Sequence, residues 1–182
     1  MASRPKITGR ATSIAGAFVH AIIPRTVDLR AQEELFRRAG INPSECVYCG
    51  AAATDQDHLR ALVKGGRPSG HYHTTDNLVP SCGRCNQSKG GSEWRAWIRG
   101  TAKGSPARRG INDIEERVAR LEVFEREAAL VLSSHAIDLR QAAGPARWDS
   151  YWQRLDDIKV LMVDAQKEAD QIVVLLEAAR PK

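Results

Sequence analysis

The residues with the clearest chemistry are four cysteines that frame an Asp-His pair. Cys46-Val-Tyr-Cys49 and Cys82-Gly-Arg-Cys85 are two C-x2-C pairs, and together they use every cysteine of the 182-residue chain. Four thiolates at this spacing fill the tetrahedral shell of a structural Zn²⁺. Two disulfides would need an oxidising compartment, and a redox C-x-x-C motif does not need two copies at this spacing. We therefore expect a structural zinc on these four cysteines.

Asp57 and His58 lie between the two cysteine pairs, and Asn86 directly follows the last cysteine. A neutral imidazole can take a proton from water near pH 7, and a hard cation such as Mg²⁺ prefers carboxylate and amide oxygens. Phosphodiester hydrolysis needs a deprotonated water and a cation beside the developing charge. His58 as base, with Asp57 and Asn86 on Mg²⁺ or another divalent cation, forms a minimal site for that reaction.

Four basic residues near this pair are candidates for contacts with the phosphates of a nucleic acid: Lys64, Arg67, Arg84 and Lys89. Each candidate has a plain structural alternative. An Asp-His pair often lies in a surface turn, an asparagine often bonds its own backbone in a turn, and a lysine is usually solvated. His71 and His73 are additional, and we interpret them as solvated loop residues, with phosphate contact as the alternative.

The order of these residues resembles the motif set of the HNH nucleases, the ββα-metal superfamily. The matching elements are Cys46-x2-Cys49, Asp57-His58, Asn77-Leu78-Val79-Pro80, Cys82-x2-Cys85-Asn86 and Lys89-Gly90, within about residues 44–98. The resemblance implies that His58 is the general base and that Asp57 and Asn86 bind the catalytic metal. It implies that Asn77 holds the loop that orients the histidine, and that the cysteines bind a separate structural zinc.

The sequence departs from the family pattern directly after the Asp57-His58 pair. Members of the family often have a proline two or three residues past the histidine, whereas here His58 is followed by Leu59-Arg60-Ala61-Leu62. We expect this difference to alter the loop and not the chemistry.

The sequence predicts an α+β fold: a small zinc-stabilised ββα-metal core with N-terminal helices and a long C-terminal α-helical hairpin. Periodicity and capping residues predict helices at 12–23 and 28–39, with Asp28 as N-cap and Gly40 as terminator. A two-stranded element is expected over 51–62, and short helices over 81–88 and 93–99. The expected divisions are a basic helical segment (1–43), the nuclease core (44–100), a linker (101–110) and the hairpin (111–182).

The C-terminal third has a heptad-like apolar pattern. Its first part runs from Ile111 to Leu132 with one break at Glu125, and its second runs from Leu155 to Ala179 without a break. Two long helices would bury these seams against each other in one chain, or against a second copy. Because a double-strand break needs two strands cut, we expect a homodimer through residues 111–182, with the intramolecular hairpin as the competing interpretation.

Charge is unevenly distributed along a chain whose net charge is +5. Residues 46–110 carry 10 basic and 4 acidic side chains, whereas residues 111–182 carry 10 basic and 14 acidic ones. The basic charge therefore lies around the cysteine-framed segment, where phosphates would bind. Residues 11–23 are apolar, but His20 interrupts them and no cleavage site follows, so we expect no signal peptide, no membrane span and a cytoplasmic protein.

These observations predict a metal-dependent endonuclease acting on double-stranded DNA, of restriction or phage type, and the resemblance implies 5′-phosphate and 3′-hydroxyl ends. One alternative is a zinc-knuckle DNA-binding module that does not cut, for which Asp57, His58 and Asn86 would have no purpose. Another is a nuclease subunit that docks on a larger DNA-processing machine through its C-terminal helices. The sequence does not specify the recognition site, modification dependence, nicking against double-strand cleavage, or biological role.

Overall fold

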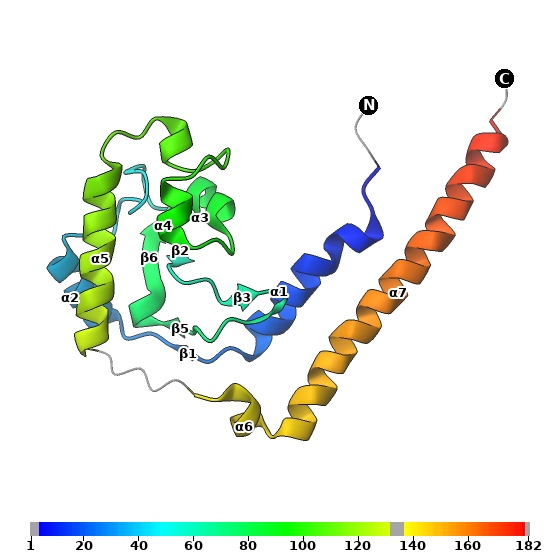
Figure 1. Ribbon diagram of the computed structural model, residues 1–182, viewed down its shortest axis with the longest axis horizontal. Helices are drawn as coiled ribbons and strands as arrows, with labels where there is room; N and C mark the ends of the chain where they lie inside the picture. The colour runs from blue at the N-terminus through cyan, green and yellow to red at the C-terminus, as the bar shows by residue number, and fades with distance from the viewer. Residues whose placement is uncertain (1–3, 132–136, 181–182) are drawn as a thin grey trace. The chain divides into compact units, whose positions relative to one another are not determined.

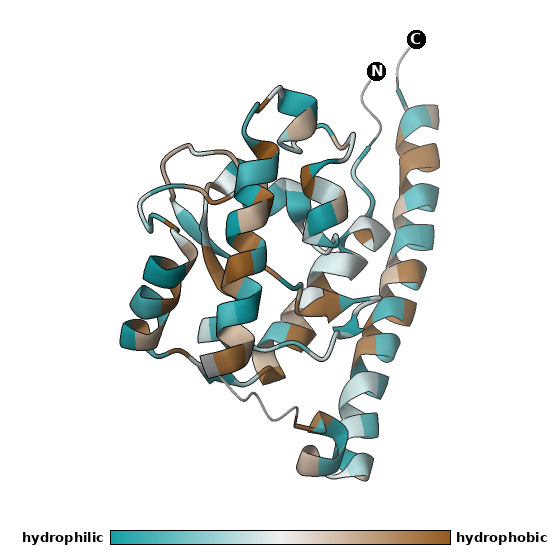
Figure 2. Ribbon diagram, turned by 60° about the vertical axis from the view of Figure 1, so that its left-hand side comes forward, coloured by the Kyte–Doolittle hydropathy of each residue, from teal (hydrophilic) through white to brown (hydrophobic). Residues whose placement is uncertain are grey.

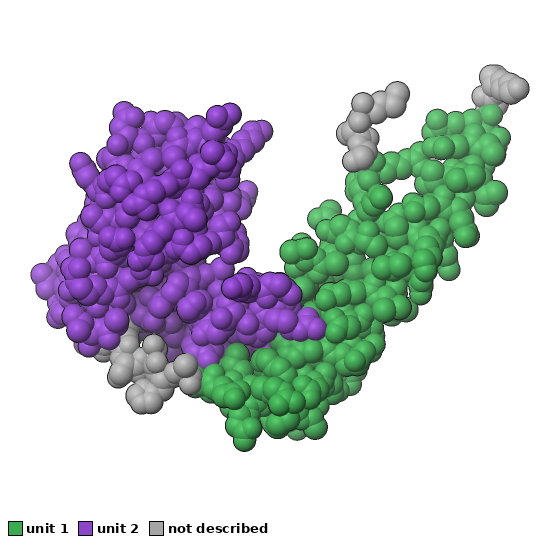
Figure 3. Space-filling model, viewed as in Figure 1, with its two compact units in different colours: residues 1–21, 137–182 green, residues 22–136 purple. Residues whose placement is uncertain are grey.

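The fold was analysed in a computed structural model that describes residues 4–131 and 137–180. The chain divides into two compact units, one formed by residues 22–136 and the other by residues 1–21 together with 137–182 (Figure 3). Helices predominate and the strands are short, so the expected α+β class is confirmed. The helices are α1 (Ala11–Ile22), α2 (Leu29–Ala39), α3 (Gly83–Lys89), α4 (Trp94–Ile98), α5 (Ile114–Val131), α6 (Leu139–Ala143) and α7 (Pro145–Ala178).

The strands form three two-stranded sheets in the unit of residues 22–136 (Figure 1). They are β1 (Arg25–Thr26), β2 (Asp55–His58), β3 (Val63–Lys64), β4 (Arg67–Pro68), β5 (His73–Thr74) and β6 (Leu78–Ser81). The pairings are β1 with β5 in parallel, and β2 with β6 and β3 with β4 antiparallel. Short 3₁₀ helices are η1 (Ile7–Arg10), η2 (Thr75–Asn77) and η3 (Ala107–Arg109).

The central ββα unit consists of β2, β6 and α3. In its register Asp57 faces Val79 and His58 faces Leu78. The partner of β2 is thus β6, some 20 residues further on, and not a second strand within 51–62 as expected. Pairing with β6 brings the Asp-His pair next to the strand that leads into the second cysteine pair and α3.

Helix α2 has the ends that the sequence predicts. Asp28 caps it, since its side chain accepts hydrogen bonds from the backbone N–H groups of Arg30 and Ala31. Gly40 ends it in the left-handed conformation, with φ of 63°. The buried face of α2 packs against α5, and both helices contribute to the core of residues 22–136.

The core of residues 22–136 joins these helices to the cysteine segment. Phe36 from α2 packs on Phe124 from α5 with ring centroids 6.0 Å apart, and Tyr48 meets Trp97 edge to face at 5.2 Å. Its buried members are Leu35, Phe36, Ala39, Ile41, Cys46, Val47, Tyr48, Leu59, Val79, Cys85, Trp94, Trp97, Ile98, Val118, Leu121, Phe124 and Ala128.

The apolar face of α5 therefore lies in the core of residues 22–136. The C-terminal helical hairpin that we expected needs correction on this point, because Val118, Leu121 and Ala128 pack with α2 and with residues of the cysteine segment. These side chains are not available for a seam with residues 146–180. Leu132, the last residue of the first expected seam, lies outside the described residues.

The segment expected to be a linker is also folded. Ser105 and Pro106 are buried, and Ser105 donates its hydroxyl to the carbonyl of Gly100 at 2.6 Å. η3 then leads into Gly110, whose φ is 74°. This segment brings Arg109 to the cysteine cluster.

The second unit is built on the long helix α7. Phe18 of α1 packs on Tyr151 and Trp152, with ring centroids 5.0 and 6.4 Å apart, and Tyr151 donates its hydroxyl to the carbonyl of Phe18 at 2.8 Å. Further along, the backbone N–H of Ile7 bonds the side chain of Gln166 at 2.7 Å. Figure 2 shows apolar positions among polar ones in the middle and C-terminal turns of α7. Among the described residues, no helix is both long enough and apolar enough to cross a membrane.

Candidate active site and metal centre

The two C-x2-C pairs come together as one cluster in which all four cysteines are free of disulfides. Their sulfur atoms all lie within 4.8 Å of one another, and the Sγ atoms of Cys49 and Cys82 are 3.8 Å apart. A tetrahedron with Zn–S bonds of about 2.3 Å has edges of about 3.8 Å. The cluster therefore has the ligand type, number and spacing that a tetrahedral zinc needs.

Each knuckle is a tight turn held by backbone hydrogen bonds. The N–H groups of Cys49 and Gly50 both bond the carbonyl of Cys46, and Val47 bonds the carbonyl of Pro80 in β6. Cys82 is the N-cap residue of α3. The proximity of the Cys46 and Cys85 thiols lowers the pKa of the Cys46 thiol to about 5 and raises the pKa of the Cys85 thiol.

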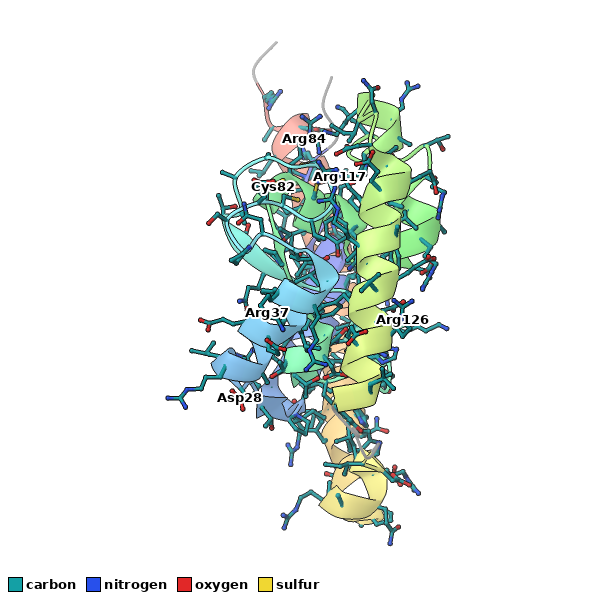
Figure 4. All side chains as sticks on the ribbon, turned by 90° about the vertical axis from the view of Figure 1, so that its left-hand side faces the viewer. Asp28, Arg37, Cys82, Arg84, Arg117 and Arg126 are labelled. Carbon is teal, nitrogen blue, oxygen red and sulfur yellow. The ribbon has the colours of Figure 1, made fainter. Side chains whose placement is uncertain are left out.

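Two arginines from outside the cysteine segment reach this cluster. Arg109 donates to the sulfur of Cys85 at 3.2 Å, and Arg117 of α5 donates to the carbonyl of Cys46 at 3.4 Å. Arg117 is itself held by Asp113, with an N–O distance of 2.6 Å. Figure 4 labels Arg117 and Cys82 at the same end of the domain. The sequence reasoning assigned no function to either arginine.

Asp57 points into the protein and is only 4 % exposed. Its Oδ2 atom accepts a hydrogen bond from the hydroxyl of Tyr48 at 2.7 Å and lies 2.9 Å from the ammonium of Lys89. Burial raises the pKa of this carboxyl, and the neighbouring Lys89 and Tyr48 act in the opposite direction. Tyr48, the second x of the first C-x2-C pair, is a site residue that the sequence reasoning missed.

Lys89 differs from its expected role as a phosphate contact. Its side chain is fully buried, and besides its ion pair with Asp57 it donates to the carbonyl of His58 at 2.8 Å. A buried ammonium has no surface from which to bind phosphate. Lys89 instead fastens α3 to the Asp-His end of β2.

His58 follows Asp57 on β2, and because side chains alternate along a strand it points to the other face. There its Nε2 lies 2.9 Å from Nδ1 of His73 on β5. The two rings meet edge to face, with centroids 5.1 Å apart. The sequence predicts that His73 is a solvated loop residue, and its position beside His58 corrects that prediction. No spacing rule in the sequence joins these two histidines.

Asn77 connects the two ends of the loop between β2 and β6. Its backbone carbonyl accepts from Leu59, its Oδ1 accepts from the N–H of Arg60 at 2.8 Å, and its Nδ2 donates to the carbonyls of Arg60 and Tyr72 at 2.9 and 3.0 Å. The residue is 1 % exposed. These bonds fasten the chain directly after His58 and directly before His73.

Asn86 lies on α3, which packs against β2. It is half-buried and three residues before Lys89, so the two share one face of the helix. Lys89 on that face reaches Asp57, so this face of α3 is the one that packs toward the Asp57 end of β2. A carboxylate and an amide oxygen are ligands that suit a hard divalent cation.

The remaining expected phosphate contacts lie at the surface of the same unit. Lys64 and Arg84 are exposed, and Arg67 is half-buried in the β3–β4 hairpin. Lys64 also lines a cavity of about 420 Å³ together with Arg60, His71 and Arg95. Among the described residues, the lining of this cavity includes Leu59, directly after His58, but not Asp57, His58 or Asn86.

The antiparallel pair β2–β6, the following helix α3 and the four-cysteine cluster form a ββα unit with a candidate metal centre. The family model for HNH endonuclease matches residues 46–92. The CRISPR-associated endonuclease Cas9 of Corynebacterium diphtheriae is 37 % identical over 62 residues, which is 32 % of this chain and 5 % of that protein. No solved structure matches the chain.

The predicted family resemblance is confirmed: residues 46–92 of the chain form an HNH endonuclease domain. The chain spans only about a twentieth of the length of the Cas9 relative. The remaining residues, including α2, α5 and α7, lie outside the matched segment.

Proposed function

We propose that this protein is a divalent-metal-dependent endonuclease that hydrolyses phosphodiester bonds in double-stranded DNA. The observation that carries the proposal is the placement of His58 and Asp57 at the end of β2, next to α3 with Asn86, inside a segment that matches the HNH endonuclease family. The Cas9 relative, named as an endonuclease, supports the same reaction class. The basic charge of residues 46–110 suits a phosphate backbone.

The proposed roles are those that the family resemblance implies for these positions. His58 takes a proton from a water molecule, whose oxygen forms a bond to phosphorus while the bond from phosphorus to the 3′ oxygen breaks. The leaving oxygen takes up a proton and becomes a 3′-hydroxyl, and the phosphate stays on the 5′ end. Asp57 and Asn86 would hold Mg²⁺ or another divalent cation, which would stabilise the charge that develops on the phosphate.

The other residues of the site position these groups. Lys89 and Tyr48 hold Asp57, since both contact its Oδ2. Asn77 holds the loop that carries His58 and His73. A Zn²⁺ in the cysteine cluster would fix the start of α3, and therefore the position of Asn86. Lys64, Arg67 and Arg84 are the proposed contacts with DNA phosphates.

The test is incubation of the full chain with plasmid and genomic DNA, with Mg²⁺ or with a chelator, followed by sequencing of the ends. We expect Mg²⁺-dependent cleavage and 5′-phosphate ends. His58→Ala is expected to lower the rate by roughly 10²–10⁴-fold, the usual contribution of a general base, with zinc content and DNA affinity unchanged. His71→Ala is the matched control, and it should cut normally.

Two results would overturn the proposal. Cleavage by His58→Ala at the wild-type rate would remove His58 as base. Binding of DNA without any cleavage under a range of divalent cations would favour a zinc-knuckle binding module.

We also propose that the protein self-associates through α7, so that two active sites reach opposite strands of DNA. Leu161, Ile172 and Leu176 are more than half exposed and lie toward one side of α7. Light scattering on the full chain is expected to give a dimer, and Leu161→Glu with Ile172→Glu is expected to give a monomer. A wild-type monomer at tens of micromolar, with and without DNA, would instead favour docking on another protein.

A further inference from the structure

One ring nitrogen of the proposed general base lies against a second histidine. Nε2 of His58 and Nδ1 of His73 are 2.9 Å apart, which is a hydrogen-bond distance, and the residues come from β2 and β5, 15 positions apart in sequence. We propose that His73 is a positioning residue that holds the His58 ring in one orientation and one tautomer. This inference rests on the proposed function, in which His58 accepts the proton from water.

The hydrogen bond between the rings determines which nitrogen of His58 can act as base. An N–H···N bond between neutral imidazoles needs one proton between Nε2 of His58 and Nδ1 of His73. If His73 supplied that proton, His58 would carry its own proton on Nδ1, and its Nε2 lone pair would be occupied. Neither nitrogen could then take a proton from water.

The opposite arrangement leaves His58 competent. His58 donates from Nε2, its Nδ1 is unprotonated and accepts the proton from water, and His73 carries its own proton on Nε2. Selection of this tautomer by the neighbouring acceptor is the role that the geometry gives His73. The same contact restricts rotation of the His58 ring, so that Nδ1 keeps a fixed direction.

His73 is itself held by residues outside the segment that matches the family. β5 pairs in parallel with β1, where Arg25 faces His73, and the N–H of His73 bonds the carbonyl of Pro24 at 3.3 Å. The hydroxyl of Thr75 accepts from the N–H of Asp28 at 2.8 Å. Residues 24–28 thus serve as a brace for β5, which gives the chain before the first cysteine pair a function in the site.

Tyr72, the residue before His73, is held by Asn77. Nδ2 of Asn77 donates to the carbonyl of Tyr72 at 3.0 Å. His73 therefore sits between two backbone attachments, one to β1 and one to Asn77. A group whose own position is fixed can orient a catalytic ring, and displacement of a catalytic group by about 1 Å can cost about 10²-fold in rate.

The experiment compares three variants of the full, zinc-loaded chain. His73→Phe keeps a planar ring and removes the nitrogen, so kcat should fall roughly 10–100-fold while KM for DNA stays unchanged. His73→Asn places an amide oxygen close to the position of Nδ1, and it should recover most of the rate. His71→Phe, in the same loop, is the control and should leave kcat unchanged.

A spectroscopic measurement tests the tautomer directly. In ¹⁵N NMR without the catalytic cation, His58 of the wild type should show a protonated Nε2 and an unprotonated Nδ1. His73→Phe should give a mixture of tautomers, and His73→Asn should restore the wild-type pattern. Zinc content and the amide spectrum identify any variant that fails to fold, and the Asn variant then carries the test.

The outcomes separate the two proposals. If His58→Ala cuts at the wild-type rate, the proposed function fails. If His58→Ala is inactive while His73→Phe has wild-type kcat and a wild-type His58 tautomer, the inference about His73 is overturned and the function stands. It is also overturned if His73→Asn is as impaired as His73→Phe, because the lost nitrogen would then not explain the defect.

Discussion

At the scale of single residues, Lys89 has the most demanding environment, because its charged group is removed from water. Its ammonium is matched by the buried Asp57 carboxylate at 2.9 Å and by the carbonyl of His58 at 2.8 Å. Breaking one half of a buried ion pair leaves the other charge uncompensated, which typically costs 3–5 kcal/mol. Lys89 is therefore expected to stabilise the folded protein, and to affect the reaction only by holding Asp57 in place.

We predict that Lys89→Met lowers the free energy of unfolding by about 3–5 kcal/mol, measured by urea denaturation of the zinc-loaded protein. The double variant Asp57→Asn, Lys89→Met should recover a large part of the loss, since neither charge then remains in the interior. Lys64→Met is the matched control, because Lys64 is exposed, and it should change stability by less than about 0.5 kcal/mol. Equal effects of Lys89→Met and Lys64→Met would contradict the prediction.

A second prediction at this scale concerns Arg109, whose guanidinium donates to the sulfur of Cys85. A Zn²⁺ with four thiolates has a net charge of −2, and a cation bonded to one sulfur stabilises that charge. Arg109→Met should therefore increase the rate at which zinc transfers to a chromophoric chelator, roughly 10–100-fold. Arg108→Met, at the exposed neighbouring position, should transfer zinc at the wild-type rate. Identical rates for the two variants would show that Arg109 has no role at the metal.

At the scale of elements, α5 is joined to the first knuckle through Gly50 and Arg117. Gly50 has φ of 76°, and a Cβ there would lie 2.6 Å from the guanidinium of Arg117. That guanidinium is fixed by Asp113 and by the carbonyl of Cys46, so moving it would break the contact between α5 and the knuckle. The glycine is needed for its backbone conformation and for this close approach.

We predict that Gly50→Ala destabilises the zinc-loaded protein more than Gly110→Ala does. Gly110 has a similar φ of 74° but no atoms within 4 Å of an added Cβ, so it measures the backbone cost alone, about 1–2 kcal/mol. The additional destabilisation at Gly50 should be smaller when Arg117 is also replaced by alanine. Denaturant unfolding of Gly50→Ala, Gly110→Ala, Arg117→Ala and the double variant checks this. Equal losses of unfolding free energy at the two glycines would refute the steric part.

The elements that the sequence predicted well are those specified by local residues. The bounds of α2 follow from Asp28 and Gly40, which act within one turn of the helix ends. The cysteine cluster follows from spacing, because a C-x2-C turn presents two thiols by itself. The helix expected over 81–88 is α3, which begins within the second cysteine pair at Gly83, and the family match covers this segment.

The contacts that the sequence did not predict depend on distant parts of the chain. β2 pairs with β6, and the position of His73 depends on β1, so neither could be found from a local pattern. Lys89 has the same sequence signature whether it is solvated or buried, and only its ion pair with Asp57 distinguishes these states. The heptad pattern of α5 was real, but periodicity does not say which surface covers an apolar face, and α2 covers this one.

At the scale of the whole molecule, all four cysteines lie in one of the two units, so we predict that zinc stabilises residues 22–136 and not the other unit. Cys46 and Cys85 belong to the core of residues 22–136, and Tyr48 between the first ligands contacts Trp97. The two thiols are buried among these side chains, so a structural metal on them would contribute to the folding free energy of this core. The other unit contains no cysteine and packs Phe18 on α7.

The four tryptophans of the chain report on the two units separately, which gives the last prediction. Trp94 and Trp97 are buried in the nuclease core, whereas Trp148 and Trp152 lie on α7. In the variant Trp148→Phe, Trp152→Phe, removal of zinc by a chelator should shift the remaining emission to longer wavelength as Trp94 and Trp97 become hydrated. In Trp94→Phe, Trp97→Phe, the same treatment should leave the emission unchanged.

Restoring zinc should reverse the shift in the first variant, and far-ultraviolet circular dichroism before chelation confirms that each variant is folded. Part of the helical signal should survive chelation, because α7 does not depend on the cysteine cluster for its ends or its packing on α1. A shift of equal size in both variants would mean that the two units unfold as one. No shift in either would mean that the nuclease core keeps its packing without zinc, and the cysteine cluster would then not be a structural metal site.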